Sequence, residues 1–189
     1  EICMRHFKRE TAVYYDYPDA WNNVGEVFLL VVNEPDSAIR YFEQATLTNP
    51  SFTAAFYNLG YTYQVTNQPE KAIPQYEKAL ELQPYEIRAM SNLAQLYQKT
   101  GQTEKAVQLN EDIIIIEPNL DLPYINLGTY AMRSGEPEKA LEYFAKAIEI
   151  NPNNFELNMR LNNYYRKVGD STRADYYLEL ARRSGKPQQ

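Results

Sequence analysis

The sequence predicts an all-α protein, a right-handed solenoid of about five helix–turn–helix repeats. Three observations lead to this fold class: a recurring frame of apolar and small residues, a constant period of 34 residues, and alanine and proline at fixed places behind each frame. A fixed period in the range of roughly 20 to 50 residues marks a repeat architecture, in which each unit buries its apolar face against its neighbours.

The frame consists of a large residue, two spacers, Leu, Gly, two spacers and an aromatic residue. It is complete at Phe56, Leu59, Gly60 and Tyr63. Its small position then recurs at intervals of 34 residues, at Ala94, Gly128 and Asn162. The first interval, from Gly25 to Gly60, is 35 residues, so the first loop is predicted to carry one extra residue.

The second half of each unit carries alanine and proline. An alanine follows the small position by twelve residues, at Ala72, Ala106, Ala140 and Ala174. Prolines end the units at Pro50, Pro84, Pro118 and Pro152. Small residues let two antiparallel helices approach, and proline disfavours helix in the residue before it. The first helix is expected to end in a left-handed residue, which Asn and Gly adopt most readily; these residues are Asn67, Gly101, Gly135 and Gly169.

This pattern resembles the tetratricopeptide repeat (TPR) family, whose frame Trp–Leu–Gly–Tyr–Ala–Phe–Ala–Pro is nearly complete in residues 52–86. The resemblance covers about 18–186. It implies one TPR array with repeats at about 18–52, 53–86, 87–120, 121–154 and 155–186. Residues 1–17 are predicted to form a helix that covers the first repeat, and residues 187–189 a tail.

Composition excludes several kinds of site. Cys3 is the only cysteine, so the chain forms no internal disulfide, and His6 is the only histidine. No Cys/His cluster could ligate zinc, and no Gly-Lys-Ser/Thr phosphate loop occurs. We therefore predict no enzyme activity, no catalytic residue, no metal and no cofactor. The chain begins at Glu1, which we interpret as a fragment or a processed product.

The charge of the chain is uneven. The net charge is −6, but residues 18–51 carry −4 and residues 155–189 carry +3. This mild total argues against nucleic-acid binding, which needs a coherent basic face. No apolar run is long enough to span a membrane, so no direct membrane insertion by this chain is expected. The compartment is not predicted.

Four asparagines stand two residues before the small position of successive repeats: Asn23, Asn58, Asn92 and Asn126. Stacked helical pairs present their first helices on a concave surface. An asparagine amide offers a donor and an acceptor, so such a column could hold an extended peptide backbone. The column resembles the asparagine ladder of O-linked N-acetylglucosamine transferase TPR superhelices. The alternative is that these asparagines bond to a neighbouring repeat.

The predicted peptide-binding surface also contains tyrosine and basic residues around this column. They are Tyr57, Tyr61, Gln95, Lys99, Arg133, Arg160, Asn163, Arg166 and Lys167. The cations concentrate from Lys99 onward, which predicts a ligand with negative charge towards repeats 4 and 5. The carboxylate clamp of chaperone-binding TPR proteins is not matched, because Asn22 and Glu26 occupy its expected Lys and Asn positions.

Two features leave self-association open. In repeat 3, Asn110 replaces the usual aromatic and Ile113 the usual alanine, and a run of isoleucines follows to Ile116. We favour local repacking over an apolar strip that pairs chains. The last helix is either polar enough to cap the array or covered by another chain.

The leading function is a non-catalytic protein-interaction scaffold that binds an extended peptide, with acidic character, in the concave groove. Two alternatives remain. The chain could be the TPR segment of a larger enzyme, such as a bacterial glycosyltransferase, or a structural self-association module.

Overall fold

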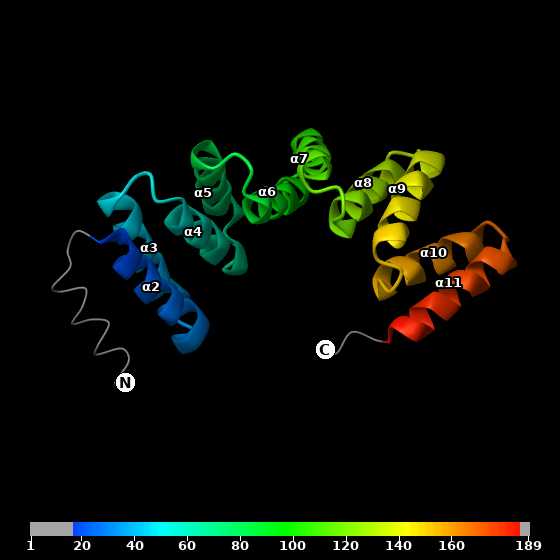
Figure 1. Cartoon of the computed structure of the whole chain (residues 1–189), viewed down its shortest axis with the longest axis horizontal. Helices are drawn as coiled ribbons and strands as arrows, with labels where there is room; N and C mark the ends of the chain where they lie inside the picture. The colour runs from blue at the N-terminus through cyan, green and yellow to red at the C-terminus, as the bar shows by residue number, and fades with distance from the viewer. Residues whose placement is uncertain (1–16, 186–189) are drawn as a thin grey trace. The chain divides into compact units, whose positions relative to one another are not determined.

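The computed structural model describes residues 17–185, and over these residues every regular element is a helix (Figure 1). The helices form five pairs, which confirms the predicted class of helical repeats. None of the helices in this range is long and apolar enough to cross a membrane. The predicted N-terminal helix, residues 1–17, lies outside the described range except for Tyr17, which precedes α2 in an extended conformation. The tail, Cys3 and His6 also lie outside that range.

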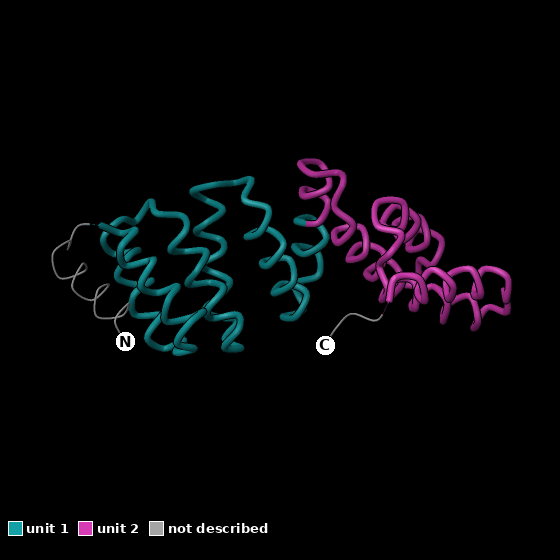
Figure 2. The backbone as a smooth tube through the Cα atoms, turned by 60° about the horizontal axis from the view of Figure 1, so that its bottom comes forward, with its two compact units in different colours: residues 1–109 teal, residues 110–189 magenta. Residues whose placement is uncertain are grey.

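The elements follow one another with short connections. They are α2 (Pro18–Val27), η1 (Phe28–Val32), α3 (Pro35–Thr48), α4 (Thr53–Val65), α5 (Pro69–Leu82), α6 (Ile87–Lys99), α7 (Thr103–Ile116), α8 (Asp121–Arg133), α9 (Pro137–Ile150), α10 (Phe155–Lys167) and α11 (Ser171–Ser184). The chain divides into two compact units, residues 1–109 and 110–189, and the boundary lies within α7 (Figure 2). Each unit is described by itself.

The turns between paired helices have the predicted backbone. Asn67 adopts φ 58° after α4, and the glycines at the equivalent places adopt φ of 80° to 82°. At the first of these turns, the N–H of Gln68 donates to the carbonyl of Tyr63 at 2.8 Å. This bond satisfies a carbonyl that the helix end leaves without an intrahelical partner. Proline at the first helical position then opens α3, α5 and α9, where its missing N–H costs no bond.

The extra residue of repeat 1 lies in a helix, so the prediction of a longer loop is wrong. α2 continues into the π-helix η1, and only Asn33 and Glu34 separate η1 from α3. Asn33 is the left-handed residue here, with φ 58°. A π-helical turn closes hydrogen bonds between residues five apart, so it takes in one more residue than an α-turn. The insertion is thus absorbed before the turn, and it leaves Leu30 and Val31 exposed.

Glycine and an aromatic ring face one another inside three of the repeats. A Cβ atom built on Gly25 would lie 2.5 Å from the ring of Phe42. The same distance separates a Cβ on Gly128 from the ring of Phe144, whereas a Cβ on Gly60 would lie 3.1 Å from the nearest ring atom of its partner. Small residues therefore lie where the two helices of a repeat cross, as predicted. They are required there because the aromatic ring of the second helix leaves no room for a Cβ atom.

Repeat 3 shows the local repacking that we favoured. Ile113 is completely buried at a position where the other repeats carry alanine, and Asn110 is buried in place of the aromatic. Of the following isoleucines, Ile115 is 79% exposed, while Ile114 and Ile116 are half-buried. The run therefore contributes side chains to the core and does not form a continuous exposed strip.

The last helix of unit 2 has a polar outer face. The exposed positions of α11 are occupied by polar or charged side chains except for Tyr176. Its inner face contributes Ala174 to a core that also contains Leu157, Leu161 and Tyr165 of α10. α11 thus divides into an apolar inner face and a polar outer face, and its role as a cap stays a prediction.

Burial keeps several tyrosines protonated in the folded chain. It is the main cause that raises the pKa of Tyr63, Tyr76, Tyr97, Tyr130 and Tyr177. For Tyr97, a hydrogen bond of 2.6 Å from its hydroxyl to the Glu77 carboxylate raises the pKa further. Tyrosine hydroxyls of the unfolded chain ionise at about pH 10. Above that pH, the unfolded chain therefore loses tyrosine protons that the folded chain keeps.

We therefore expect the free energy of unfolding to fall as the pH rises above about 10, by up to about 1.4 kcal/mol per pH unit for each such tyrosine. Urea titrations between about pH 9 and pH 11 measure this loss of stability, as a fall in the urea concentration at the midpoint of unfolding. In Tyr97→Phe the fall should be shallower, since this side chain no longer titrates. A midpoint that does not change over this range would contradict the prediction.

Candidate peptide-binding surface

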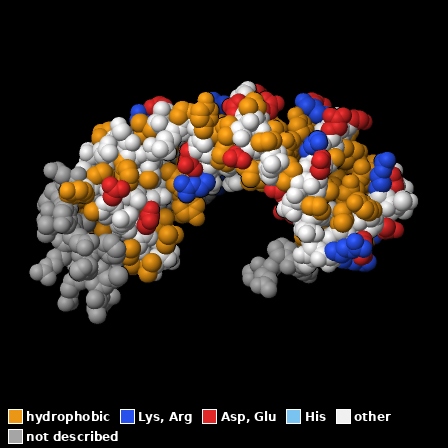
Figure 3. Space-filling view, viewed as in Figure 1, with side chains coloured by type: hydrophobic (Ala, Val, Ile, Leu, Met, Phe, Trp, Pro, Cys, Tyr) orange, Lys and Arg blue, Asp and Glu red, His pale blue; other side chains and the backbone are white. Residues whose placement is uncertain are grey.

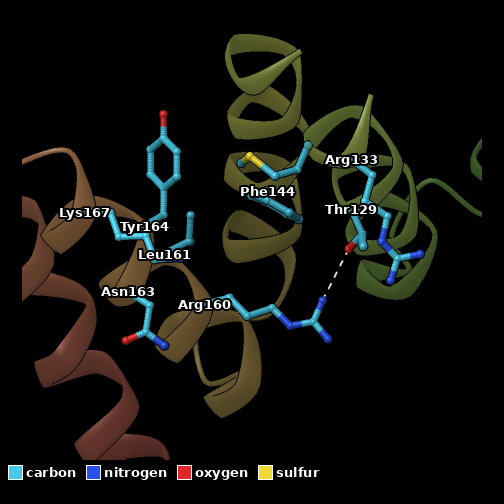
Figure 4. Close-up of a pocket in the computed structure, with 9 residues that line it drawn as sticks. Thr129, Arg133, Phe144, Arg160, Leu161, Asn163, Tyr164 and Lys167 are labelled. Atoms are coloured by element: carbon cyan, nitrogen blue, oxygen red, sulfur yellow. Dashed lines mark hydrogen bonds between the residues drawn. The ribbon is translucent and has the colours of Figure 1, made fainter. Parts of the chain in front are cut away.

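A cavity of about 420 Å³ lies in unit 2 where α8, α9 and α10 meet (Figure 4). Four of the predicted peptide-binding residues line it: Arg133, Arg160, Asn163 and Lys167. Three of these four are cations, and all four side chains are exposed. The structure thus brings together the basic residues that the sequence assigned to repeats 4 and 5, apart from Arg166, which is exposed but does not line the cavity.

Helical spacing explains this arrangement. Arg160, Asn163 and Lys167 follow one another at intervals of three and four residues, so they share one face of α10. On α8, Thr129 and Arg133 are four residues apart and share the facing side. Cations therefore enter the lining from two different helices, and their like charges favour an anion between them.

Apart from Thr129, the remaining lining is mainly apolar. It consists of Met132, Phe144, Leu161 and Tyr164, of which Phe144 and Leu161 also belong to the buried core. Sequence reasoning did not assign these residues to the site, because aromatic and leucine residues of the repeat frame indicate core. The space-filling view shows apolar side chains gathered over α8 to α10, with Lys and Arg side chains around them (Figure 3).

Arg160 is held in an extended conformation by two partners. One terminal nitrogen donates to the Glu156 carboxylate at 2.7 Å, and the other lies 3.3 Å from Thr129 Oγ1. The second contact crosses from α10 to α8, as the dashed line in Figure 4 shows. The bond to Glu156 is an exposed contact one helical turn away, so its contribution to stability is small. The pair of contacts mainly orients the guanidinium towards the cavity.

In unit 1, the predicted residues lie along α4 and α6. Tyr61, Gln95 and Lys99 are exposed, and Lys99 Nζ donates to Asn67 Oδ1. Tyr57 is half-buried and lies under the Arg88 guanidinium, 4.8 Å from its centre to the ring centroid. It also lines a hollow of about 240 Å³. This hollow contains no cation other than Arg88, so it differs in chemistry from the cavity of unit 2.

The asparagine column makes hydrogen bonds inside the protein. Asn58 Nδ2 lies 2.9 Å from Asn22 Oδ1 and 2.8 Å from Glu26 Oε1, both on α2. Asn92 Nδ2 donates to the hydroxyl of Tyr76 at 3.1 Å. These contacts bond one repeat to the preceding one, which is the alternative that the sequence left open. Together with a longer bond from Asn92 Nδ2 to the Tyr57 hydroxyl, at 3.4 Å, they occupy both N–H groups of each amide. Among the described residues, no side chain or backbone group donates to either carbonyl oxygen.

In unit 2 the same bond joins Asn126 Nδ2 to Asn110 Oδ1 at 2.9 Å. Asn110, the acceptor, stands at the position of repeat 3 that is equivalent to Tyr76 in repeat 2. Tyr76 is the acceptor for Asn92 in unit 1. Asn23 differs, since it is exposed and the neighbouring Asn22 makes the inter-repeat bond. Part of the column therefore stabilises the stacking of repeats, and its use as a peptide ladder stays a prediction.

The described residues contain no group of three or more His, Cys, Asp or Glu side chains placed to hold a metal ion. The polar groups around the cavity are three cations, one amide and the hydroxyls of Thr129 and Tyr164, all of which can donate hydrogen bonds. This set suits the recognition of carboxylates by hydrogen bonds and charge.

Comparison with known families identifies the class of protein. Residues 52–114 and residues 123–154 each match a model of the tetratricopeptide repeat, and together the two matches cover half of the chain. With five helical pairs in the described range, the chain belongs to the tetratricopeptide repeat family. Proteins of this family generally act as scaffolds that bind other proteins or peptides. Among curated proteins, none matches the chain in sequence.

Solved structures share the fold at low sequence identity. A MamA fragment from Desulfovibrio magneticus RS-1 is 20% identical, with a TM-score of 0.78 over 90% of this chain and 97% of that one. PilF of Pseudomonas aeruginosa is 23% identical, with a TM-score of 0.76 over 90% and 78%. YrrB, described as a TPR protein with an unusual peptide-binding site, is 20% identical, with a TM-score of 0.75 over 94% and 91%.

Proposed function

We propose that this chain is a non-catalytic protein-interaction scaffold that binds an extended peptide on the face of unit 2 formed by α8 and α10. The observation that carries the proposal is the cavity whose lining includes Arg133, Arg160 and Lys167. Three cations around one opening favour a ligand segment with carboxylates, because arginine binds a carboxylate through parallel hydrogen bonds. The structural relative YrrB, described as having a peptide-binding site, supports a peptide as the kind of ligand.

The asparagine column has a reduced role in this proposal. One N–H of the Asn126 amide is bonded to Asn110, and the carbonyl oxygen is the group that would accept a peptide N–H. In unit 1, the proposal assigns the same acceptor role to Asn58 and Asn92, and an exposed hydrogen-bonding role to Asn23. Further along α4, α6 and α10, it assigns contacts to Tyr57, Tyr61, Gln95, Lys99 and Arg166.

The test is fluorescence polarisation with two labelled probe peptides of about 12 residues, which span roughly 40 Å when extended. One carries glutamates on both sides of a central phenylalanine, and the other carries glutamines in place of the glutamates. We expect the acidic probe to bind more tightly, with an affinity that falls as salt is added. Removing the three cations of the cavity with Arg133→Ala, Arg160→Ala and Lys167→Ala should weaken its binding by at least roughly tenfold.

A matched triple variant controls for net charge. Arg173→Ala, Arg182→Ala and Arg183→Ala remove the same charge from exposed positions of α11, outside the cavity. Circular dichroism establishes that both variants remain helical. Equal weakening by the two variants would show that binding depends on net charge alone, and equal affinity for the acidic and neutral probes would refute the proposal.

A further inference from the structure

We infer that the cavity of unit 2 selects a bulky apolar residue, with aromatic residues preferred, placed between acidic residues of the ligand. This inference rests on the proposed function and names the class of peptide. It starts from the part of the lining that the charges do not explain: Met132, Phe144, Leu161 and Tyr164. These side chains offer an apolar surface, and a carboxylate seated on such a surface would lose its hydration without gaining a partner.

The size of the cavity agrees with one large side chain and its backbone. A volume of about 420 Å³ falls in the lower part of the range of ligand cavities, roughly 300 to 1,000 Å³. An alanine or serine would leave most of that space to water in contact with Phe144 and Leu161. An aromatic side chain buries roughly 150 to 250 Å² and packs with its edge or face on other rings. Tyr164 offers such a ring at the edge of the cavity (Figure 4).

The position of the cations sets the place of the acidic residues. Arg133 enters the lining from α8, whereas Arg160 and Lys167 enter it from α10. Charge therefore stands on both helices that border the apolar floor, and a side chain inserted between them would have cations on either side. The hydrocarbon stems of these long side chains extend the apolar wall while their charged ends stay in water.

The Arg160 side chain is already oriented before a ligand arrives. Its contacts with Glu156 and Thr129 restrict the rotamers of a side chain that otherwise loses much freedom on binding. Glu156 is exposed, so a ligand carboxylate can take its place on the guanidinium without uncovering a buried charge. The site thus combines an apolar floor, which prefers one kind of side chain, with a charged border that selects the flanking residues.

The experiment adds a third probe to the two described above, an acidic peptide with alanine in place of the central phenylalanine. We expect the phenylalanine probe to bind the unaltered chain about 10- to 100-fold more tightly than the alanine probe, the effect of burying one large apolar side chain. Equal affinity of these two acidic probes would overturn the inference. If both bind more tightly than the neutral probe, the proposed function stands without it.

A cavity-filling variant then tests where the anchor binds. Thr129→Trp places a large ring into the lining, and Ala145→Trp places the same ring on an exposed position of α9 as a control. In Thr129→Trp, the ratio of the affinities for the phenylalanine and alanine probes should fall to near one, while the acidic probe should still bind more tightly than the neutral probe. The second should leave both preferences unchanged. A preference for phenylalanine that persists in a folded Thr129→Trp protein would place the anchor elsewhere and refute the assignment.

Discussion

Replacing Ile113 by alanine is expected to lower the free energy of unfolding by about 2 to 5 kcal/mol. Alanine is the residue at the equivalent position of the other four repeats, so a repeat consensus would recommend this change. The structure predicts the opposite, because Ile113 is completely buried and Asn110 occupies the place that an aromatic ring takes in repeats 1, 2 and 4. Loss of this buried side chain therefore removes apolar contacts and leaves a cavity.

Ile115→Ala is the matched control for this experiment. It makes the same chemical change in the same helix, at a side chain that is 79% exposed, and it should alter stability by less than about 0.5 kcal/mol. Urea denaturation followed by circular dichroism measures both variants. A loss of the same size at both positions, or a gain at Ile113, would contradict the repacking described for repeat 3.

Replacing Gly25 by alanine is expected to cost about 1 to 3 kcal/mol, although alanine favours a helix over glycine by about 1 kcal/mol. The reason is steric, since the added Cβ would lie 2.5 Å from the Phe42 ring, closer than any real contact. Gly60→Ala should cost much less or nothing. There the Cβ would lie 3.1 Å from the Tyr76 ring, a distance that a small shift relieves while the gain in helix propensity remains.

A double-mutant cycle distinguishes this clash from a general effect on the helix. With Phe42→Leu as the second change, the two substitutions should cost less together than the sum of their separate costs, by roughly 0.5 to 3 kcal/mol. The chain contains a precedent in repeat 5, where Asn162 and Leu178 occupy the two positions. Strict additivity, or an equal cost of Gly25→Ala and Gly60→Ala, would mean that the ring contact does not decide the result.

The helices could be predicted from the sequence because their period, their prolines and their turn residues agree with one another. Asn67 and Gly101 show this agreement, since each marks the end of a first helix and each adopts the left-handed backbone. The extra residue of repeat 1 could not be placed in this way. Counting shows only that it lies between Gly25 and Gly60, and a helix absorbs an insertion as a π-turn when the residues after it still pack.

The sequence predicted the basic residues that line the candidate cavity, but it did not predict the apolar residues at its base. Arg160 and Lys167 are informative because a cation on the inner face of a first helix has no role in the core. Phe144 and Leu161 carry no such signal, since the same residues build the core and line the cavity. The bonds of Asn92 and Asn126 depend on what the preceding helix presents, a tyrosine hydroxyl in one case and an amide in the other.

The glycine–ring contacts determine where two such repeat proteins can exchange segments by recombination without a steric clash. Gly25 and Phe42 belong to one repeat, so an exchange of whole repeats carries both partners along. The bond from Asn126 to Asn110 joins two repeats, and an exchange there would risk one hydrogen bond, about 0.5 to 1.5 kcal/mol. A crossover between the two helices of a repeat is different, because it can put a Cβ against a ring. Viable chimeras should therefore break at the prolines that end the repeats and avoid the turns inside them.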